Sequence, residues 1–281
     1  MASTTSFSGK TVVITGGATG IGFALAKAFG TEGARIVIGE PRASRLEEAA
    51  ASLGDLGIDV STMVMDVTDP ESVGAFADFA WERYGAVHVL INNAGISTGL
   101  RSMTKLPLAD MHRVFDVNVF GVWYGSAIFG KRMIDQGEPA AIYNVGSENS
   151  FFNAMPKMAA YIATKHAVRG MTEAMREDFP DFITIGLICP GFVKTELTKG
   201  PFADHAMDAD MFAAKVLEQV KAGQFYIMTH AYNIERIKPV HAEIEGALAT
   251  YAPRYEGDEA LDVRILLERS TRPGQDPDEA A

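Results

Sequence analysis

Short runs of β-branched and other apolar residues alternate with longer stretches of helical spacing along most of the chain. The runs predict strands over 10–15, 35–39, 60–65, 87–92, 141–145 and 183–188, with a seventh over 225–229. The intervening stretches predict helices over 20–33, 42–53, 70–84, 108–133 and 155–179. Because the strands are apolar almost throughout, they fit a parallel sheet that is covered on both faces. The alternation therefore predicts an α/β fold with a Rossmann-type, doubly wound parallel sheet of about seven strands.

The 281 residues suffice for one large domain or two small ones. We expect a single catalytic domain over 1–270, because no repeat or linker interrupts 1–260. Further helices are predicted within 232–269. Residues 271–281, rich in Pro, Gly and acid, are expected to be a disordered tail.

The composition argues against several kinds of partner. The formal net charge is −11, so we expect neither a nucleic acid nor a membrane as partner. The only cysteine, Cys189, excludes an internal disulfide framework and fits a reducing compartment. The polar N-terminus lacks a secretory signal and no apolar run is long enough to span a bilayer, so a cytoplasmic location is expected. The histidines show no metal-ligand spacing, and no metal site is predicted.

A glycine-rich turn, TGGATGIG at 15–22, joins the first predicted strand to the first predicted helix. Gly16, Gly20 and Gly22 allow a tight turn and a close approach of the backbone to a pyrophosphate, beside the positive end of the helix. Three glycines alone are a weak signal, since they also suit a turn that only packs helix on sheet. Their position in an alternating chain indicates a dinucleotide site.

Glu40 follows the second predicted strand, 20 residues after Gly20. A carboxylate at this place accepts hydrogen bonds from the adenosine ribose and repels a 2′-phosphate. Thr19 stands where a basic residue could otherwise bind that phosphate. Arg42 argues the other way, because it can pair with the phosphate. We therefore expect NAD as the cofactor, with NADP as the alternative.

Tyr161 and Lys165 are four residues apart in a predicted helix, so their side chains share one face. A free tyrosine has a pKa near 10, but a nearby ammonium and a cationic nicotinamide lower it. Tyr161 could then exchange a proton with an alcohol or ketone while a hydride passes to or from the cofactor. The spacing alone is usually a solvated helix face.

Taken in order, the motifs over about residues 8–230 resemble those of the short-chain dehydrogenase/reductase family, in its single-domain subtype. TGGATGIG resembles the family's TGxxxGxG turn, and NNAG at 92–95 is similar to the motif that closes the fourth strand. The other matches are Asp66-Val67 after the third strand, Asn118 in DVNVFG, Tyr161 and Lys165 in YIATK, and PGFVKT at 190–195.

The resemblance implies a role for each matched residue. Tyr161 would be the acid/base, Lys165 would bind the nicotinamide ribose and tune Tyr161, and Ser147 would hydrogen-bond the substrate oxygen. Asn118 would hold a water that links Lys165 to solvent. The residues implied to contact the dinucleotide are Gly16, Thr19, Gly20, Ile21, Gly22, Glu40, Asp66, Val67, Asn93, Ala94, Gly95, Tyr161, Lys165, Pro190, Gly191, Val193 and Thr195.

The catalytic serine has two candidates. Ser147 precedes Tyr161 by 14 residues, where the family more often has 13, and Asn149-Ser150 replaces the usual glycine region. A one-residue loop insertion absorbs this difference. Ser150 stays open as the alternative.

Residues 196–213 correspond to the family's lid over the substrate. The substrate pocket is expected to be lined by Phe151, Phe152, Met155, Phe202, Met207 and Met211. These side chains predict a bulky apolar or aromatic substrate, unless they only pack the lid onto the body. The C-terminal stretch, from FYIMTH to ERIKPVHAEIEGAL, loosely resembles bacterial dehydrogenases that oxidise benzylic alcohols of lignin-derived aryl ethers. The family resemblance also implies a homodimer or homotetramer built on the long fourth and fifth helices.

Three other kinds of protein share part of this pattern with an NAD-dependent alcohol dehydrogenase. An NADPH-dependent ketone reductase would differ in its cofactor preference at Glu40 and Arg42. A sugar-nucleotide epimerase normally has a TGxxGxxG turn, which this chain lacks. A non-catalytic dinucleotide-sensing protein would lack part of the Asn–Ser–Tyr–Lys set, and all four residues are present. The sequence therefore predicts a dehydrogenase that acts on the CH–OH group of a secondary alcohol, or on the corresponding ketone.

Overall fold

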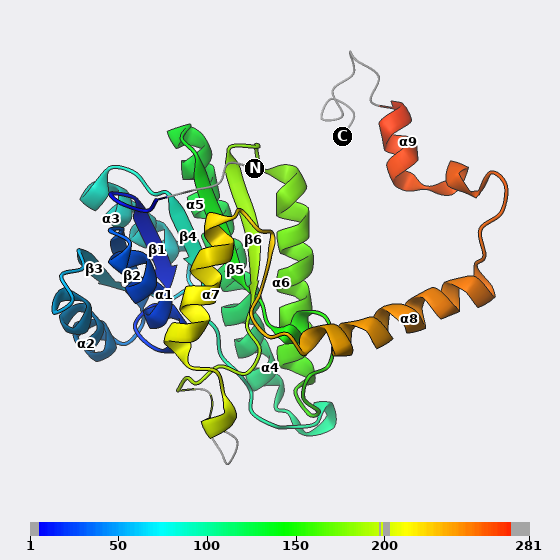
Figure 1. The fold of residues 1–281 in the computed structure, drawn as a ribbon, viewed down its shortest axis with the longest axis horizontal. Helices are drawn as coiled ribbons and strands as arrows, with labels where there is room; N and C mark the ends of the chain where they lie inside the picture. The colour runs from blue at the N-terminus through cyan, green and yellow to red at the C-terminus, as the bar shows by residue number, and fades with distance from the viewer. Residues whose placement is uncertain (1–5, 197, 199–202, 271–281) are drawn as a thin grey trace. The chain divides into compact units, whose positions relative to one another are not determined.

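The computed structural model describes residues 6–196, 198 and 203–270. Its centre is a seven-stranded sheet in the order β3-β2-β1-β4-β5-β6-β7, in which every neighbouring pair is parallel (Figure 1). The strand bounds are β1 Thr11–Thr15, β2 Arg35–Glu40, β3 Val60–Val64, β4 Val89–Asn92, β5 Ala140–Val145, β6 Ile183–Cys189 and β7 Tyr226–Met228. The predicted fold class is confirmed. The strand order reverses between β1 and β4, and this switch point leaves a crevice at the carboxyl ends of the strands.

Nine α-helices lie among the described residues. Their bounds are α1 Gly20–Thr31, α2 Ala43–Gly54, α3 Pro70–Tyr84, α4 Leu108–Phe115, α5 Gly121–Gln136, α6 Ala159–Asp178, α7 Ala209–Lys221, α8 Asn233–Tyr251 and α9 Val263–Ser270. A π-helical turn, Asp116–Phe120, joins α4 to α5, so the single helix predicted over 108–133 contains a change of helical pitch. Such turns inside helices are frequent at functional sites.

Both faces of the sheet are buried. Along β1, the side chains of Val12 and Ile14 pack against α1, α2 and α7, whereas Val13 packs against α3, α5 and α6. All three valine and isoleucine side chains are fully buried. This two-sided burial explains why the strands are apolar at every position and not at alternate ones.

Local residue chemistry sets several helix ends. Asp69 accepts a hydrogen bond from the Glu71 amide and Pro70 occupies the first turn of α3, while Gly85 ends that helix with a φ of 77°. Helix α6 begins at Ala159, four residues later than the predicted start at 155. Lys157 has a φ of 64°, which a right-handed helix cannot accommodate.

The chain divides into two compact units, Met1–Asn233 and Ile234–Ala281. The sheet and helices α1 to α7 lie in the first unit, and the part of α8 after Asn233 and α9 lie in the second. The expected tail at 271–281 lies outside the described residues. Within the residues that the structure describes, none of the helices has the length and apolar character needed to cross a bilayer.

Candidate active site

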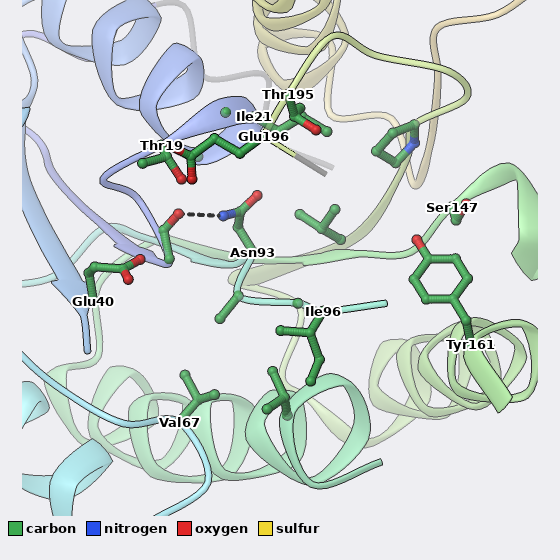
Figure 2. A pocket seen from close by; sticks show the side chains of 18 of the residues that line it. Thr19, Ile21, Glu40, Val67, Asn93, Ile96, Ser147, Tyr161, Thr195 and Glu196 are labelled. Carbon is green, nitrogen blue, oxygen red and sulfur yellow. Dashed lines mark hydrogen bonds between the residues drawn. The ribbon is translucent and has the colours of Figure 1, made fainter. Parts of the chain in front are cut away.

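A cavity of about 840 Å³ lies at the carboxyl ends of the strands, across the switch point between β1 and β4 (Figure 2). All the residues that the sequence predicted to contact a dinucleotide line this cavity, and so does Ser147. They come from the loops after β1, β3, β4, β5 and β6, from the last residue of β2, and from the helices α1 and α6. Ligands of open α/β sheets bind at this place, because the loops of neighbouring strands diverge there.

The glycine-rich turn forms a cradle that side chains would fill. A Cβ atom on Gly16 would lie 2.9 Å from Ala94 Cα, and one on Gly22 would lie 2.4 Å from Gly16 O. Gly16 also has a φ of 62°, in the left-handed region that favours glycine. Asn93 Nδ2 donates hydrogen bonds to Thr15 O at 3.0 Å and to Gly16 O at 2.9 Å, which fix the turn to the end of β4. The cradle therefore fits a group that needs close backbone contact, such as a pyrophosphate.

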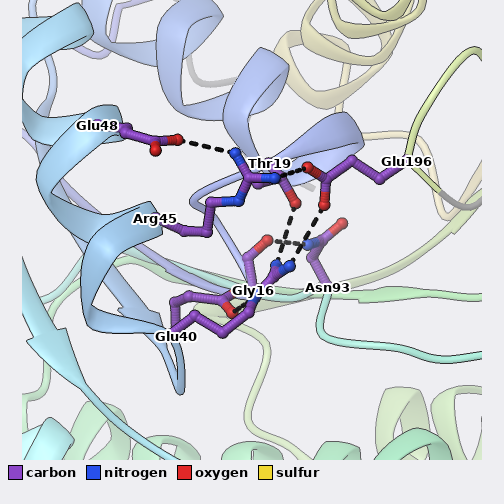
Figure 3. Close-up of polar contacts among 8 residues, drawn as sticks. Gly16, Thr19, Glu40, Arg45, Glu48, Asn93 and Glu196 are labelled. Carbon is purple, nitrogen blue, oxygen red and sulfur yellow. Dashed lines mark hydrogen bonds and ion pairs between the residues drawn. The ribbon is translucent and has the colours of Figure 1, made fainter.

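The adenosine end of this cavity carries Glu40, the last residue of β2. Its side chain is nearly buried and accepts a 2.6 Å hydrogen bond from Arg42 Nε. Arg42 also reaches Glu196, which in turn pairs with Arg45 (Figure 3). Sequence reasoning identified Glu40 and Arg42 but missed Glu196 and Arg45. Glu196 lies about 150 residues after Arg45 in the sequence, and no sequence motif relates two residues so far apart.

Tyr161 and Lys165 lie on α6 at the other end of the cavity. Lys165 Nζ is 5.7 Å from the centroid of the Tyr161 ring and donates a 2.8 Å hydrogen bond to Val145 O. Ser147 follows β5, and its hydroxyl faces that of Tyr161 (Figure 2). A substrate oxygen at this end of the cavity can therefore contact both hydroxyl groups.

Burial controls the protonation of this pair. It raises the pKa of the Tyr161 phenol above its ordinary value, an effect that the hydrogen bond with Ser147 opposes and the nearby Glu148 carboxylate increases. Burial lowers the pKa of the Lys165 ammonium to about 8. Lys165 is therefore still mostly charged at neutral pH, and its positive charge favours the Tyr161 phenolate.

Ser150 has a structural position. It is fully buried, its hydroxyl donates a 2.8 Å hydrogen bond to Lys165 O, and it accepts one of 3.2 Å from Ser147 N. It closes the 3-10 turn Glu148–Ser150 and does not line the cavity. Of the two candidate serines, the geometry favours Ser147.

Asn118 lies in the π-helical turn, behind the cavity wall and not in its lining. Its Nδ2 donates hydrogen bonds to Ile96 O at 2.9 Å and to Thr164 Oγ1 at 3.2 Å, and its Oδ1 accepts one from Ile96 N at 2.8 Å. These contacts connect the loop after β4, at Ile96, to α6, at Thr164. Thr164 directly precedes Lys165 in the sequence. Asn118 therefore fixes the wall beside the lysine.

None of the predicted substrate-pocket residues that the structure describes lines this cavity, and the substrate pocket stays a prediction. The Phe151 ring packs 5.7 Å from the Tyr226 ring, with the Arg169 guanidinium 4.7 Å from its centroid, so it turns away from the cavity. Phe152 is buried, Met155 and Met211 are exposed, and Met207 packs against the core. None of these five residues lines the cavity, and Phe202 lies outside the described residues. The large apolar side chains that do line it beside Ser147 and Tyr161 include Ile96 and Phe192, which the sequence did not single out.

Cys189 ends β6 in the core. It is fully buried, and burial raises the pKa of its thiol to about 12, so it is protonated at neutral pH and a poor nucleophile. In the part of the chain that the structure describes, no group of three or more His, Cys, Asp or Glu side chains is placed to hold a metal ion.

The fold and the cavity together define a dinucleotide-binding protein of the Rossmann type. Residues 10–206 match the short chain dehydrogenase family. The chain is 34% identical to 1-deoxy-11-beta-hydroxypentalenate dehydrogenase of Streptomyces avermitilis, over 79% of this chain and 85% of that protein. This chain therefore belongs to the short-chain dehydrogenase family, and it is an oxidoreductase that binds a nicotinamide dinucleotide.

Two solved structures resemble it closely. A short-chain dehydrogenase/reductase from Burkholderia phymatum, in complex with NAD, is 30% identical with a TM-score of 0.81, over 86% of this chain and 96% of that chain. An alcohol dehydrogenase from Thermococcus sibiricus, in complex with 5-hydroxy-NADP, is 28% identical with a TM-score of 0.68, over 76% and 89% of the two chains. Similar proteins thus hold either type of dinucleotide, and the choice in this chain depends on its own residues.

Proposed function

We propose that this oxidoreductase interconverts a secondary alcohol and a ketone with NAD as its cofactor and Tyr161 as its acid/base. The observation that carries the proposal is the facing pair of Ser147 and Tyr161 hydroxyls at one end of the cavity, with Lys165 buried beside them. The opposite end, with the glycine cradle and Glu40, fits the adenosine and pyrophosphate of the cofactor.

The residues of the chain have complementary tasks. Ser147 hydrogen-bonds the substrate oxygen and holds it beside the Tyr161 hydroxyl. Tyr161 takes the hydroxyl proton of the alcohol, or donates a proton to the ketone oxygen in the reverse direction. When bound, the nicotinamide accepts or supplies the hydride. Lys165 supplies the positive charge that lowers the pKa of Tyr161, against the opposing effect of burial.

Proton exchange with solvent needs a path past the buried lysine. Asn118 Nδ2 donates to two partners and Oδ1 accepts from one, so Oδ1 has a lone pair left for a further donor. A Cβ atom on Gly95 would lie 3.5 Å from this oxygen and 3.8 Å from Lys165 Nζ, which places both groups beside the same small glycine. A water held there by Asn118 would connect Lys165 to solvent.

The preference for NAD rests on Glu40. Its buried carboxylate at the end of β2 can accept hydrogen bonds from the ribose hydroxyls and would repel a 2′-phosphate. Arg42, the residue that argued for NADP, already donates to Glu40 and contacts Glu196. Its guanidinium is therefore less available to a phosphate than the sequence suggested.

The substrate is assigned by chemical class. Ile96 and Phe192 present apolar surface in the cavity, which favours a secondary alcohol with apolar groups around the reacting carbon. The relative from Streptomyces avermitilis is named for a hydroxyl-bearing substrate, which agrees with this class. A bulky aromatic substrate stays a prediction of the sequence; the Phe151 ring packs against Tyr226 and Arg169 and adds no surface to this cavity.

A spectrophotometric screen tests the proposal. Secondary alcohols of graded size would be offered with NAD or NADP, and formation of the reduced cofactor would be followed by absorbance. We expect NAD-dependent oxidation of at least one apolar secondary alcohol and no reaction with matched tertiary alcohols, which have no carbinol hydrogen. Absence of turnover with every secondary alcohol and ketone, although NAD binds, would contradict the proposed function.

We also propose that the protein is a homodimer or homotetramer in the cytoplasm, assembled through the long helices as the family resemblance implies. Leu108 on α4, Phe120 in the π-helical turn and Trp123 on α5 are exposed large apolar side chains in these helices. Burial between two copies would remove them from water. Sedimentation of the unaltered protein and of Trp123→Glu tests this, because the charged variant should dissociate towards a smaller species.

A further inference from the structure

Glu196 holds two arginines of a distant segment. Its Oε2 lies 3.3 Å from a terminal guanidinium nitrogen of Arg42, and its Oε1 lies 2.6 Å from one of Arg45 (Figure 3). Arg45 makes a second ion pair of 2.8 Å with Glu48 on the same helix. The side chain of Glu196 thus bridges the loop after β6 to the start of α2, with one carboxylate oxygen on each arginine.

This bridge stands where the adenosine ribose would bind. Thr19, Glu40, Arg42 and Glu196 all line the cavity at this end. The side chains of Arg42 and Glu196 are 49% and 43% exposed, so a phosphate arriving from solvent can reach their charged groups. Arg45 is 39% exposed and contacts the same carboxylate.

The charges explain what the bridge does. Glu40 is paired with Arg42 and the exposed Glu48 with Arg45, so without Glu196 each arginine would keep a single carboxylate partner, and no carboxylate would contact both guanidinium groups. Guanidinium groups bind phosphate through two parallel N–H donors, and a 2′-phosphate would compete for the same donors that Glu196 now occupies. A carboxylate in the same place also repels the phosphate.

We propose that Glu196 is a cofactor-selectivity residue, whose carboxylate occupies Arg42 and Arg45 and so disfavours a dinucleotide that carries a 2′-phosphate. This inference rests on the proposed function, because it needs the adenosine ribose at Glu40. It adds a second carboxylate, supplied by the loop after β6, to the selectivity that the sequence assigned to Glu40 alone.

The expected effect is moderate. Ion pairs between half-exposed side chains are weak, because water screens them and both side chains lose freedom. Glu196→Gln should therefore lower the dissociation constant for NADP by about three- to tenfold relative to that for NAD. The gain should shrink as salt concentration rises, since the contacts are exposed.

The test is calorimetric titration of the full chain with NAD and with NADP. Glu48→Gln is the matched control, because it removes the same charge from Arg45 but from a residue outside the cavity lining. We expect Glu196→Gln to raise the affinity for NADP relative to NAD and Glu48→Gln to leave the ratio within twofold. Adding Arg45→Ala to Glu196→Gln should remove part of the gain. Glu196→Ala, which should behave like Glu196→Gln, provides a second variant if the first folds poorly.

Each outcome has a separate meaning. An unchanged ratio in both Glu196 variants, with NAD still bound, would overturn the role of Glu196 and leave the proposed function standing. An equal gain in Glu48→Gln would also overturn it, because the effect would then be one of overall charge. Failure of the unaltered protein to bind either dinucleotide would instead overturn the proposed function, and this inference with it.

Discussion

The Tyr232 hydroxyl donates a 2.7 Å hydrogen bond to Oε2 of Glu148, the residue that follows Ser147. Glu148 is half-buried, and burial raises the pKa of its carboxyl while the Tyr232 hydrogen bond lowers it. Its negative charge raises the pKa of Tyr161. The pair therefore contributes, from outside the family motifs, to the electrostatic environment of Tyr161, the proposed acid/base.

Removing the charge of Glu148 should change the pH dependence of alcohol oxidation. The Glu148 carboxylate raises the pKa of Tyr161, and the Lys165 ammonium lies 5.7 Å from the centroid of its ring. In Glu148→Gln the phenolate forms more easily, so the rise of kcat/KM with pH should move to lower pH. Tyr232→Phe, which keeps the charge, is the control and should shift the profile less. Superimposable profiles for Glu148→Gln and the unaltered protein would contradict this reasoning.

Lys165 should make the folded protein less stable at neutral pH. Its pKa falls from 10.5 to about 8 on burial, so between these values the unfolded chain binds more protons and the free energy of unfolding rises with pH. Below about pH 8 the full cost is present, roughly 3 kcal/mol at 1.36 kcal/mol per pKa unit. Lys165→Met also loses the hydrogen bond to Val145, worth about 1 kcal/mol.

Urea denaturation of Lys165→Met measures the balance of these effects. We expect the variant to have lower turnover, a free energy of unfolding about 1–2 kcal/mol higher at pH 7, and a flatter dependence between pH 8 and 10.5. A variant that is less stable at pH 7 than the unaltered protein would show that Lys165 contributes favourably to folding.

Substitution of Ser147 should lower kcat far more than substitution of Ser150, which should act on stability. Ser147→Ala removes the hydroxyl that faces Tyr161 (Figure 2), so kcat should fall by roughly a hundredfold; it also removes the acceptor of the Asn149 N–H, at a cost of about 1 kcal/mol. Ser150→Ala leaves the buried Ser147 N–H without a partner and removes the second donor to Lys165 C=O, which keeps its bond within α6, at a cost of about 1–3 kcal/mol. Measuring kcat and thermal unfolding of both variants checks the assignment. A hundredfold loss of kcat in Ser150→Ala, together with an unchanged kcat in Ser147→Ala, would reverse the assignment of the two serines.

Glu40→Ala should weaken NAD binding by about one to two orders of magnitude, because charge-assisted hydrogen bonds to the ribose contribute roughly 1.5–3 kcal/mol each. The same change frees Arg42, which now donates to Glu40. NADP should therefore bind better, and the preference could invert. The ratio of kcat/KM values with the two cofactors, before and after the substitution, is the measurement. A preference for NADP in the unaltered protein would show that Arg42 outweighs Glu40.

The fold could be predicted because its determinants are local. Strand and helix periodicity are read over short windows, and the glycine turn, NNAG and PGFVKT each lie at a strand end that the sheet brings to one edge. For the same reason every predicted dinucleotide contact lines the cavity. Because each of these residues follows or ends a strand, the order of the strands in the sheet is sufficient to bring them together.

The parts that could not be predicted depend on tertiary packing. The direction of the Phe151 ring is set by Arg169 and Tyr226, from α6 and β7, which the sequence around Phe151 does not indicate. The bridge from Glu196 to Arg45 joins residues about 150 positions apart, with no motif to relate them.

The most direct test of the central claim is Tyr161→Phe, compared with the unaltered protein by single-turnover kinetics and by calorimetric titration with NAD. The substitution removes one hydroxyl at the Ser147 end of the cavity and leaves the glycine cradle and Glu40 untouched. We predict unchanged folding, a dissociation constant for NAD close to that of the unaltered protein, and hydride transfer slower by at least about a hundredfold. Hydride transfer at nearly the original rate in Tyr161→Phe would contradict the assignment of Tyr161 as the acid/base.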